Sequence, residues 1–314
     1  MALMKIFLDG HDAENNFPAK RPILAHYTSI DTLEKILTNN ELWLSHPFYM
    51  NDIEEFKFGM NQGYNIFCSS KELVDAFDDR SEYFHLIELF KGHFNNYDLT
   101  HAFDTYIICF SEHSPHDSDG LLSMWRAYGN DGKGVALVVD TAKINSFNDS
   151  PLVISKVQYS STSDRLKWMK SKIVAIAELI KKSEITVELL HSIATQWLES
   201  LKIYSLFTKH SGFEEENEWR IVYMSDRDPR KKLESMLSYT VTNTGIEPKM
   251  KLKVNPVDGV IGNQSIANLT DQIIIGPSIS STLVSKSFIR LLEKIGQGDL
   301  SEKVYSSSIP FRSR

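Results

Sequence analysis

Two glutamates, Glu216 and Glu218, stand one residue apart where an acidic loop runs into an apolar stretch. If this stretch is one extended strand, side chains two positions apart point to the same face. Both carboxylates would then share a face with Arg220, while Trp219 and Ile221 point to the other. Repulsion between them would raise at least one pKa. Such a pair suits a reaction whose transition state carries positive charge. The alternative is that both are solvated and Arg220 neutralises Glu218.

A second candidate group is the run His26-Tyr27-Thr28-Ser29, where a strand is expected to end and a helix to begin. Such a junction exposes side chains and backbone donors to a ligand, and a helix N-terminus favours anionic groups. The alternative is structural. Thr28 or Ser29 would cap the helix, and His26 would be a half-buried polar residue.

Two tyrosines could face a flat ligand. Tyr49 precedes a run that also reads as a capped helix start. Tyr128 lies three residues after Trp125 on a short expected helix, on a face that is either core or pocket. The loop after Ser111 also brings together His113, His116, Asp117 and Asp119. This spacing matches no common zinc signature, and a polar surface loop is the simpler interpretation.

Hydrophobic periodicity predicts the elements that would position these residues. Strands are expected at 23–27, 42–44, 105–110, 134–139, 153–159, 219–224, 238–241, 250–254, 271–276 and 303–307. Helices are expected at about 29–39, 71–77, 82–94, 121–128, 164–206 with a break near 183, and 283–295, and residues 111–120 are expected as a loop. This order predicts an α+β fold. A polar leader at 1–22 would precede one domain at 23–314 with a helical insertion at about 163–207.

The composition narrows the class of protein. A hydrophobic fraction of 42% indicates a folded globular chain. Only Cys68 and Cys109 occur, which argues against a disulfide framework and suits a reducing cytosol. No apolar run reaches the ~20 residues that span a bilayer, and residues 1–18 lack a signal-peptide pattern. A net charge of −7 gives no general nucleic-acid footprint, although residues 227–232 form a basic cluster. We therefore expect a cytoplasmic protein with no membrane partner.

The early and late motifs resemble one branch of a known superfamily. The order His26-Tyr27-Thr28-Ser29, then Ile36-Leu37, then Glu41-Leu42 is similar to the opening of the diphtheria-toxin and poly(ADP-ribose) polymerase branch of ADP-ribosyltransferases. The run from Asn217 to Tyr223 looks like its catalytic-glutamate strand. The spacing of Glu216 and Glu218 resembles the two-glutamate motif of bacterial transferase toxins.

The chain as a whole resembles the bacterial domain-of-unknown-function family 2971. The matching runs extend from about residue 23 to 312, and include Leu42-Trp43-Leu44-Ser45, Met50 to Glu55, Cys109-Phe110-Ser111, Met124-Trp125 with Tyr128, Gly134-Val135, Glu216 to Arg220 and Ile309 to Arg312. This resemblance implies a bacterial protein from phage-defence or toxin loci.

Together the resemblances imply an NAD-dependent mono-ADP-ribosyltransferase with an ADP-ribosyltransferase-like split mixed β-sheet and no metal. Glu218 would stabilise the ribose cation that forms as nicotinamide leaves, and Glu216 would orient or deprotonate the acceptor. His26 would hold the adenosine-side ribose. NAD would be the substrate, and a protein, RNA or DNA the acceptor; an antitoxin could neutralise the protein.

The rest of the pocket follows less directly from the resemblance. Thr28 or Ser29 would assist His26. Tyr49 or Tyr128 would stack on nicotinamide, while Ser111 competes with them for the second motif of the family. Arg220 would fix Glu218 or meet a phosphate.

One departure from the family pattern leaves other functions open. Tyr27 replaces a glycine whose backbone holds the nicotinamide amide in the transferases. One alternative is therefore a catalytically inactive module on the same fold that binds a nucleotide or a partner. Another is a metal-dependent hydrolase or nuclease that uses His113, His116, Asp117 and Asp119.

Overall fold

The chain divides into two compact units in the computed structural model, which describes residues 16–50, 53–98, 104–147, 150–242 and 245–311. The helical unit includes Pro47–Thr105 and Val157–Phe213. The sheet unit comprises Glu14–His46, Tyr106–Lys156 and Glu214–Arg314. The insertion expected at about 163–207 therefore forms only part of the helical unit, because residues 47–105 belong to it as well.

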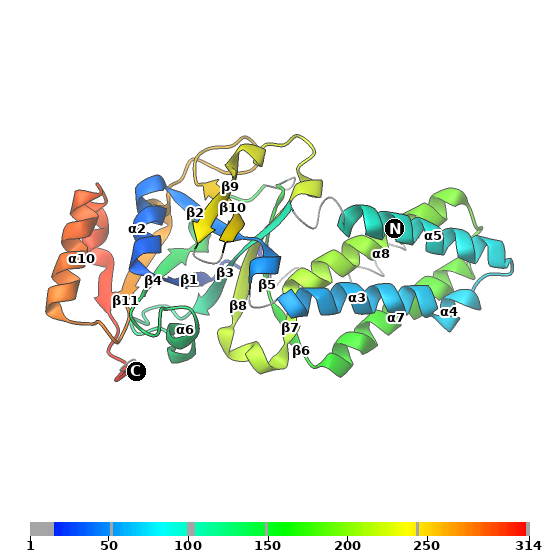
Figure 1. Cartoon of the computed structure of the whole chain (residues 1–314), viewed down its shortest axis with the longest axis horizontal. Coiled ribbons are helices and arrows are strands. Elements are labelled where there is room, and N and C mark those ends of the chain that lie inside the picture. The colour runs from blue at the N-terminus through cyan, green and yellow to red at the C-terminus, as the bar shows by residue number, and fades with distance from the viewer. Residues whose placement is uncertain (1–15, 51–52, 99–103, 148–149, 243–244, 312–314) are drawn as a thin grey trace. The chain divides into compact units, whose positions relative to one another are not determined.

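The sheet unit is built on a mixed β-sheet, as the expected α+β class requires (Figure 1). Its strands are β1 (Ile23–Thr28), β2 (Glu41–Ser45), β3 (Thr105–His113), β4 (Val135–Asp140), β5 (Leu152–Lys156), β8 (Glu218–Met224), β9 (Leu237–Thr242), β10 (Gly245–Lys253), β11 (Thr270–Ile275) and β12 (Val304–Ser306). Within the described residues eight of these ten strands run in the order β12-β11-β4-β1-β3-β2-β10-β9, and β8 pairs with both β3 and β5. β11 and β12 are parallel, whereas β1 is antiparallel to both β3 and β4.

The two faces of the central strands carry different cores. Leu24, Leu137 and Ile221 belong to the larger cluster of buried apolar side chains, and the face that carries them is the main-core face. Ala25 and Tyr27, on the alternate positions of β1, belong to a smaller cluster. We call the side of the sheet that carries this smaller cluster the α6 face, because residues of the helix α6 (Leu122–Ala127) belong to the cluster. Because alternate residues of a strand point to opposite sides, neighbouring residues on β1, β3 and β8 are assigned to different faces.

Among the described residues, serine side chains cap three of the four helices of the sheet unit, and α6 has no side-chain cap. The four helices are α2 (Ile30–Asn39), α6, α9 (Ile266–Leu269) and α10 (Thr282–Lys294), with short 3₁₀ turns η5 (Thr141–Lys143), η7 (Ser225–Arg227), η8 (Glu234–Met236) and η9 (Gly298–Lys303). On α2 the buried stripe is Leu33, Ile36 and Leu37, as expected. The helix ends at Asn40, whose φ of 53° is tolerated by asparagine.

The helical unit is a bundle of α3 (Ile53–Ser69), α4 (Lys71–Val74), α5 (Arg80–Asn96), α7 (Thr162–Ile180) and α8 (Val187–Phe207). It also holds η2 (Pro47–Tyr49) and a parallel pair, β6 (Gln158–Ser160) with β7 (Thr208–His210). Helix α8 packs against α3 and α5. Stacked rings hold the bundle together: the centroids of Phe67 and Trp197 lie 5.8 Å apart, and those of Trp168 and Tyr204 lie 4.0 Å apart.

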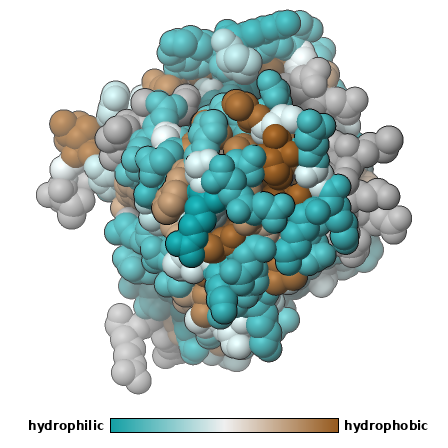
Figure 2. All heavy atoms as spheres, turned by 90° about the vertical axis from the view of Figure 1, so that its right-hand side faces the viewer, coloured by the Kyte–Doolittle hydropathy of each residue, from teal (hydrophilic) through white to brown (hydrophobic). Residues whose placement is uncertain are grey.

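Figure 2 shows the right-hand side of Figure 1 turned toward the viewer. This surface is mostly hydrophilic, with apolar side chains between the hydrophilic ones. Among the described residues, no helix has the length and apolar character needed to cross a bilayer.

Candidate functional site

Strand β8 begins with Glu218, the residue for which the resemblance implies a catalytic role. Glu218 and Arg220 point to the same side, and both side chains are only 4% exposed. Arg220 Nε donates to Glu218 Oε1 at 2.7 Å, and Nη2 donates to Oε2 at 3.1 Å. Of the two roles expected for Arg220, the structure therefore displays the one in which it fixes Glu218. The residue between them, Trp219, is buried in the main core.

Glu216 is not part of this strand, which differs from the expected shared face. It is the last residue of the 3₁₀ helix η6 (Ser211–Glu216), and Asn217 follows with a φ of 43°. A left-handed residue breaks the alternation that would carry Glu216 and Glu218 to the same side of one strand. Asparagine tolerates that conformation, so the chain turns there before the strand begins.

Three of the predicted site residues nevertheless meet at this turn. The hydroxyl of Ser111 donates to the backbone carbonyl of Glu216 at 2.7 Å. The hydroxyl of Tyr128, which follows α6 and is 37% exposed, donates to Glu216 Oε1 at 3.1 Å. Ser111 was expected at the start of a loop, but it lies within β3, which extends to His113. Because β3 and β8 pair, this longer strand brings Ser111 to the beginning of β8.

Glu218 and Ser111 share the α6 face of the sheet. Their chain neighbours Trp219 and Glu112 are joined by a hydrogen bond, from Trp219 Nε1 to Glu112 Oε2 at 3.0 Å. That bond is on the main-core face, where Glu112 also pairs in register with Leu24. Alternation then directs Glu218 and Ser111 to the opposite side.

Tyr27 also lies on the α6 face, where it supports the segment that leads into α6. Its hydroxyl oxygen accepts a hydrogen bond from the backbone N–H of Leu121 at 2.9 Å, and its ring meets Trp125 edge-on at 4.8 Å. Burial raises the pKa of Tyr27 to about 12, the hydrogen bond from Leu121 opposes this rise, and the charge of Asp117 adds to it. A Cβ on Gly120 would come within 2.7 Å of this hydroxyl. Tyr27 therefore fills the space beside β1 with its own side chain.

His26 points to the main-core face, opposite to the side of Glu218. Its Nδ1–H donates to the backbone carbonyl of Cys109 at 2.9 Å, and its ring lies 5.4 Å from that of Phe110. His26 keeps some accessible surface. Burial nevertheless lowers the pKa of its imidazole, and the bond to Cys109 offsets part of that effect. The imidazole and the carboxylate of Glu218 are thus not directed into one site.

The remaining predicted residues have separate positions. Ser29 is the N-cap of α2, because its Oγ accepts from the backbone N–H of Thr32 at 3.1 Å. Thr28 is the last residue of β1 and pairs with Val135 in β4. Tyr49 lies in η2 of the helical unit and is 55% exposed.

The loop proposed for metal chemistry is held together by its own hydrogen bonds. A ring nitrogen of His113 bonds to the backbone carbonyl of Asp117 at 2.8 Å. Asp117 Oδ1 accepts from the backbone N–H of Asp119 at 2.8 Å, and Asp119 accepts from the hydroxyl of Ser308 at 3.1 Å. In the part of the chain that the structure describes, no three His, Cys, Asp or Glu side chains gather closely enough to hold a metal ion.

Sequence reasoning missed a strongly perturbed carboxylate near β8, that of Glu112. Lys20 and Lys156 donate to it at 3.1 and 2.8 Å, in addition to the indole of Trp219. Burial acts to raise its pKa, but the hydrogen bonds from Lys156, Trp219 and Lys20 outweigh it and lower the pKa to about 2. The signal was the polar alternation after Phe110, which continues the strand instead of ending it.

Comparison with known proteins adds one match. Residues 124–221 match a family described as a protein of unknown function (DUF2971). The matched segment begins in α6 and ends in β8, so it includes Tyr128, Glu216 and Glu218, whereas His26 and Ser111 precede it. No curated protein and no solved structure matches the chain. The resemblance to domain-of-unknown-function family 2971 is therefore supported over residues 124–221, which is less than half of the chain.

Proposed function

We propose that the chain is an NAD-dependent mono-ADP-ribosyltransferase that acts on a macromolecule as a toxin or phage-defence effector. Its reaction centre would be the turn that leads into β8. The observation that carries this proposal is the convergence of Ser111 and Tyr128 on Glu216, two residues before the fixed carboxylate of Glu218. Three separate elements thus supply polar groups to one place on the α6 face.

Glu218 would stabilise the transition state. When the bond between nicotinamide and ribose breaks, positive charge develops on the sugar, and a preorganised carboxylate stabilises that charge. The two bonds from Arg220 hold the carboxylate in one orientation. In the proposed mechanism one of its oxygens would accept a hydrogen bond from a ribose hydroxyl.

Glu216 would serve the acceptor. It is partly exposed, and Tyr128 sets the position of its Oε1. A carboxylate in this position can orient an attacking hydroxyl or amine and take its proton, which is the role of a general base. Tyr128 would also offer its exposed ring to nicotinamide, since aromatic faces stack on flat heterocycles.

His26 is not part of this proposed centre, because its side chain is on the main-core face. Its expected contact with the adenosine-side ribose is therefore replaced by a structural role in joining β1 to β3. Tyr27 has no positive φ, so its backbone does not need glycine; its side chain supports Leu121.

The test uses NAD labelled in the adenosine half, with measurement of both nicotinamide release and label transfer to bacterial protein and RNA. Glu218→Gln should lower both rates by about a hundredfold or more. Glu216→Gln should lower transfer to the macromolecule more than nicotinamide release, because water can still act as acceptor. Glu214→Gln, on an exposed residue of the same turn, is the matched control and should keep both rates. Equal activity of wild type and Glu218→Gln would remove Glu218 from the mechanism.

A second function, a module that binds a nucleotide or partner without chemistry, is favoured by the buried ion pair. Arg220 neutralises the charge of Glu218 and leaves the carboxylate almost inaccessible. Calorimetry with NAD separates the two functions. Binding of NAD without release of nicotinamide identifies the module, and release that depends on Glu218 identifies the transferase.

A further inference from the structure

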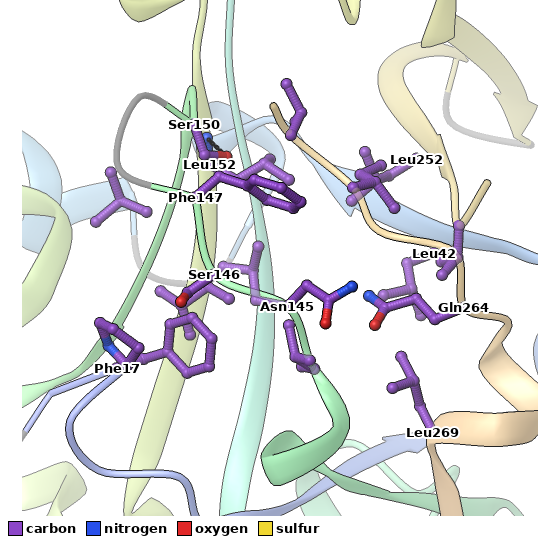
Figure 3. A pocket seen from close by; sticks show the side chains of 18 of the residues that line it. Phe17, Leu42, Asn145, Ser146, Phe147, Ser150, Leu152, Leu252, Gln264 and Leu269 are labelled. Carbon is purple, nitrogen blue, oxygen red and sulfur yellow. Dashed lines mark hydrogen bonds between the residues drawn. The ribbon is translucent and has the colours of Figure 1, made fainter. Parts of the chain in front are cut away.

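A cavity of about 360 Å³ opens within the sheet unit (Figure 3). Its walls include Leu42, Leu152, Ile221 and Leu252, which belong to the main core or pack against it. Its volume is within the range of small-molecule sites, which are mostly apolar with a few fixed polar groups. Since Ile221 and Glu218 have opposite parity on β8, the cavity and Glu218 are on different faces of the sheet.

Two side-chain amides, those of Asn145 and Gln264, are among the polar groups of this cavity, which is also lined by Ser146, Ser150 and Arg227. Figure 3 shows the amides of Asn145 and Gln264 pointing toward one another, with Phe147 on the same wall as Leu152. Gln264 Oε1 is buried and has no hydrogen-bond partner. Buried polar atoms without a hydrogen-bond partner are rare in folded proteins. A ligand that donates a hydrogen bond to Gln264 Oε1 would provide the partner.

The backbone makes room for one of these amides. A Cβ at Gly262 would come within 1.8 Å of Asn145 Nδ2, so only glycine lets the Asn145 side chain lie where it does. Gly262 does not have a positive φ, so its lack of a side chain matters here for space and not for backbone conformation.

We propose that this cavity binds the adenine base of a nucleoside or nucleotide. The carboxamide of Asn or Gln matches adenine through two hydrogen bonds, because the amide oxygen accepts from the exocyclic amine and the amide nitrogen donates to a ring nitrogen. Gln264 offers the unpartnered acceptor, and Asn145 offers a second amide. The aromatic and aliphatic walls suit the flat faces of the ring. Guanine presents two acceptors on the corresponding edge, so it fits this pair less well.

The site is independent of the proposed transferase activity. It lies on the face of Ile221, and none of its lining residues belongs to the turn around Glu216. It would therefore bind adenosine whether or not the protein cleaves NAD.

Isothermal titration calorimetry of the whole chain with adenosine and with guanosine tests the proposal. Adenosine should bind at least about tenfold more tightly than guanosine. Gln264→Leu should weaken adenosine binding by about tenfold or more, and Gly262→Ala should weaken it too, because the added methyl displaces Asn145. Gln272→Leu is the matched control: its Oε1 is also buried without a partner, but it does not line the cavity. It should leave binding unchanged.

Circular dichroism and thermal unfolding establish that each variant is folded. The proposal is overturned if wild type binds no adenosine, if guanosine or an apolar probe such as indole binds as tightly, or if folded Gln264→Leu binds adenosine like wild type. Glu218→Gln separates the two proposals. It should keep adenosine binding in the cavity while it loses nicotinamide release.

Discussion

Arg220 and Glu218 form a bidentate ion pair inside the sheet unit, with donor–acceptor distances of 2.7 and 3.1 Å. They are two residues apart on one strand, so alternation brings them to the same side. Both side chains are almost completely buried, which makes the pair costly to break and cheaper to replace as a whole.

Removal of one partner should therefore destabilise the chain more than removal of both. Arg220→Met leaves the Glu218 carboxylate buried without the two hydrogen bonds from Arg220, and we expect a loss of about 3–5 kcal/mol in the free energy of unfolding. The double variant Arg220→Met with Glu218→Leu leaves neither charge, so it should lose less than Arg220→Met alone. Urea unfolding measures both values, and a double variant that is less stable than the single one would contradict this account.

An exposed ion pair of the same unit provides the control. Lys231 Nζ lies 2.7 Å from Glu234 Oε1, but both side chains are more than half exposed. Glu234→Gln should change the free energy of unfolding by less than about 1 kcal/mol.

The charge of Glu112 should make stability depend on pH in the acidic range. Its pKa is about 2 in the folded chain because Lys156, Trp219 and Lys20 donate to it, against an ordinary value of 4.5. A carboxylate with a lowered pKa in the folded state stabilises the protein above its unfolded pKa. That contribution is lost as the pH falls from about 5 toward 2. Wild type should therefore be more stable than Glu112→Gln at pH 7, and the difference should shrink over that interval.

Urea unfolding of wild type and Glu112→Gln at several pH values measures the difference between their free energies of unfolding. Groups that titrate in the same way in both proteins do not contribute to this difference. Glu293→Gln, at an exposed position of α10, is the matched substitution. A difference between wild type and Glu112→Gln that stays constant from pH 7 to 3 would show that Glu112 does not make the expected contribution.

Most elements could be predicted from the sequence because local signals agree with the tertiary structure. Ser29 caps α2, as expected for Thr28 or Ser29, and the break near residue 183 separates α7 from α8. Helix α3 was missed beyond its first turn. Gly59 and Gly63 lower its helix propensity, but a Cβ there would come within 2.2 Å of Ser205 and 2.1 Å of Leu201 in α8. Close packing between helices, which no local pattern reports, is the reason for both glycines.

The candidate site could be predicted only in part. The strand period correctly placed Glu218 beside Arg220, because β8 is regular from its first residue. It misplaced Glu216 because one left-handed residue, Asn217, precedes that strand. The side of the sheet to which the His26 side chain points depends on which face of β1 packs in the main core. Both faces of β1 are covered by apolar side chains, so its sequence does not distinguish them.

Protonation of His26 should destabilise the sheet unit. Burial lowers its pKa in the folded chain, so the unfolded chain binds the proton first as the pH falls. The free energy of unfolding should therefore decrease as the pH falls below about 6.5, the ordinary pKa of histidine. His26→Gln keeps a donor for the Cys109 carbonyl but cannot titrate, so its stability deficit relative to wild type should narrow between pH 7 and 5. Urea unfolding at both pH values checks this, and a deficit that widens would contradict it.

The hydroxyl of Tyr27 should be worth more to stability than that of an exposed tyrosine. Tyr27→Phe keeps the ring against Trp125 but leaves the backbone N–H of Leu121 without its acceptor. Because that N–H is partly buried, we expect a loss of about 1–3 kcal/mol in the free energy of unfolding. Tyr305→Phe, at a 44% exposed position, should change it by less than about 0.5 kcal/mol. Thermal and urea unfolding compare the two variants. Equal effects would mean that water replaces the Tyr27 hydroxyl, and that the segment before α6 does not depend on this tyrosine.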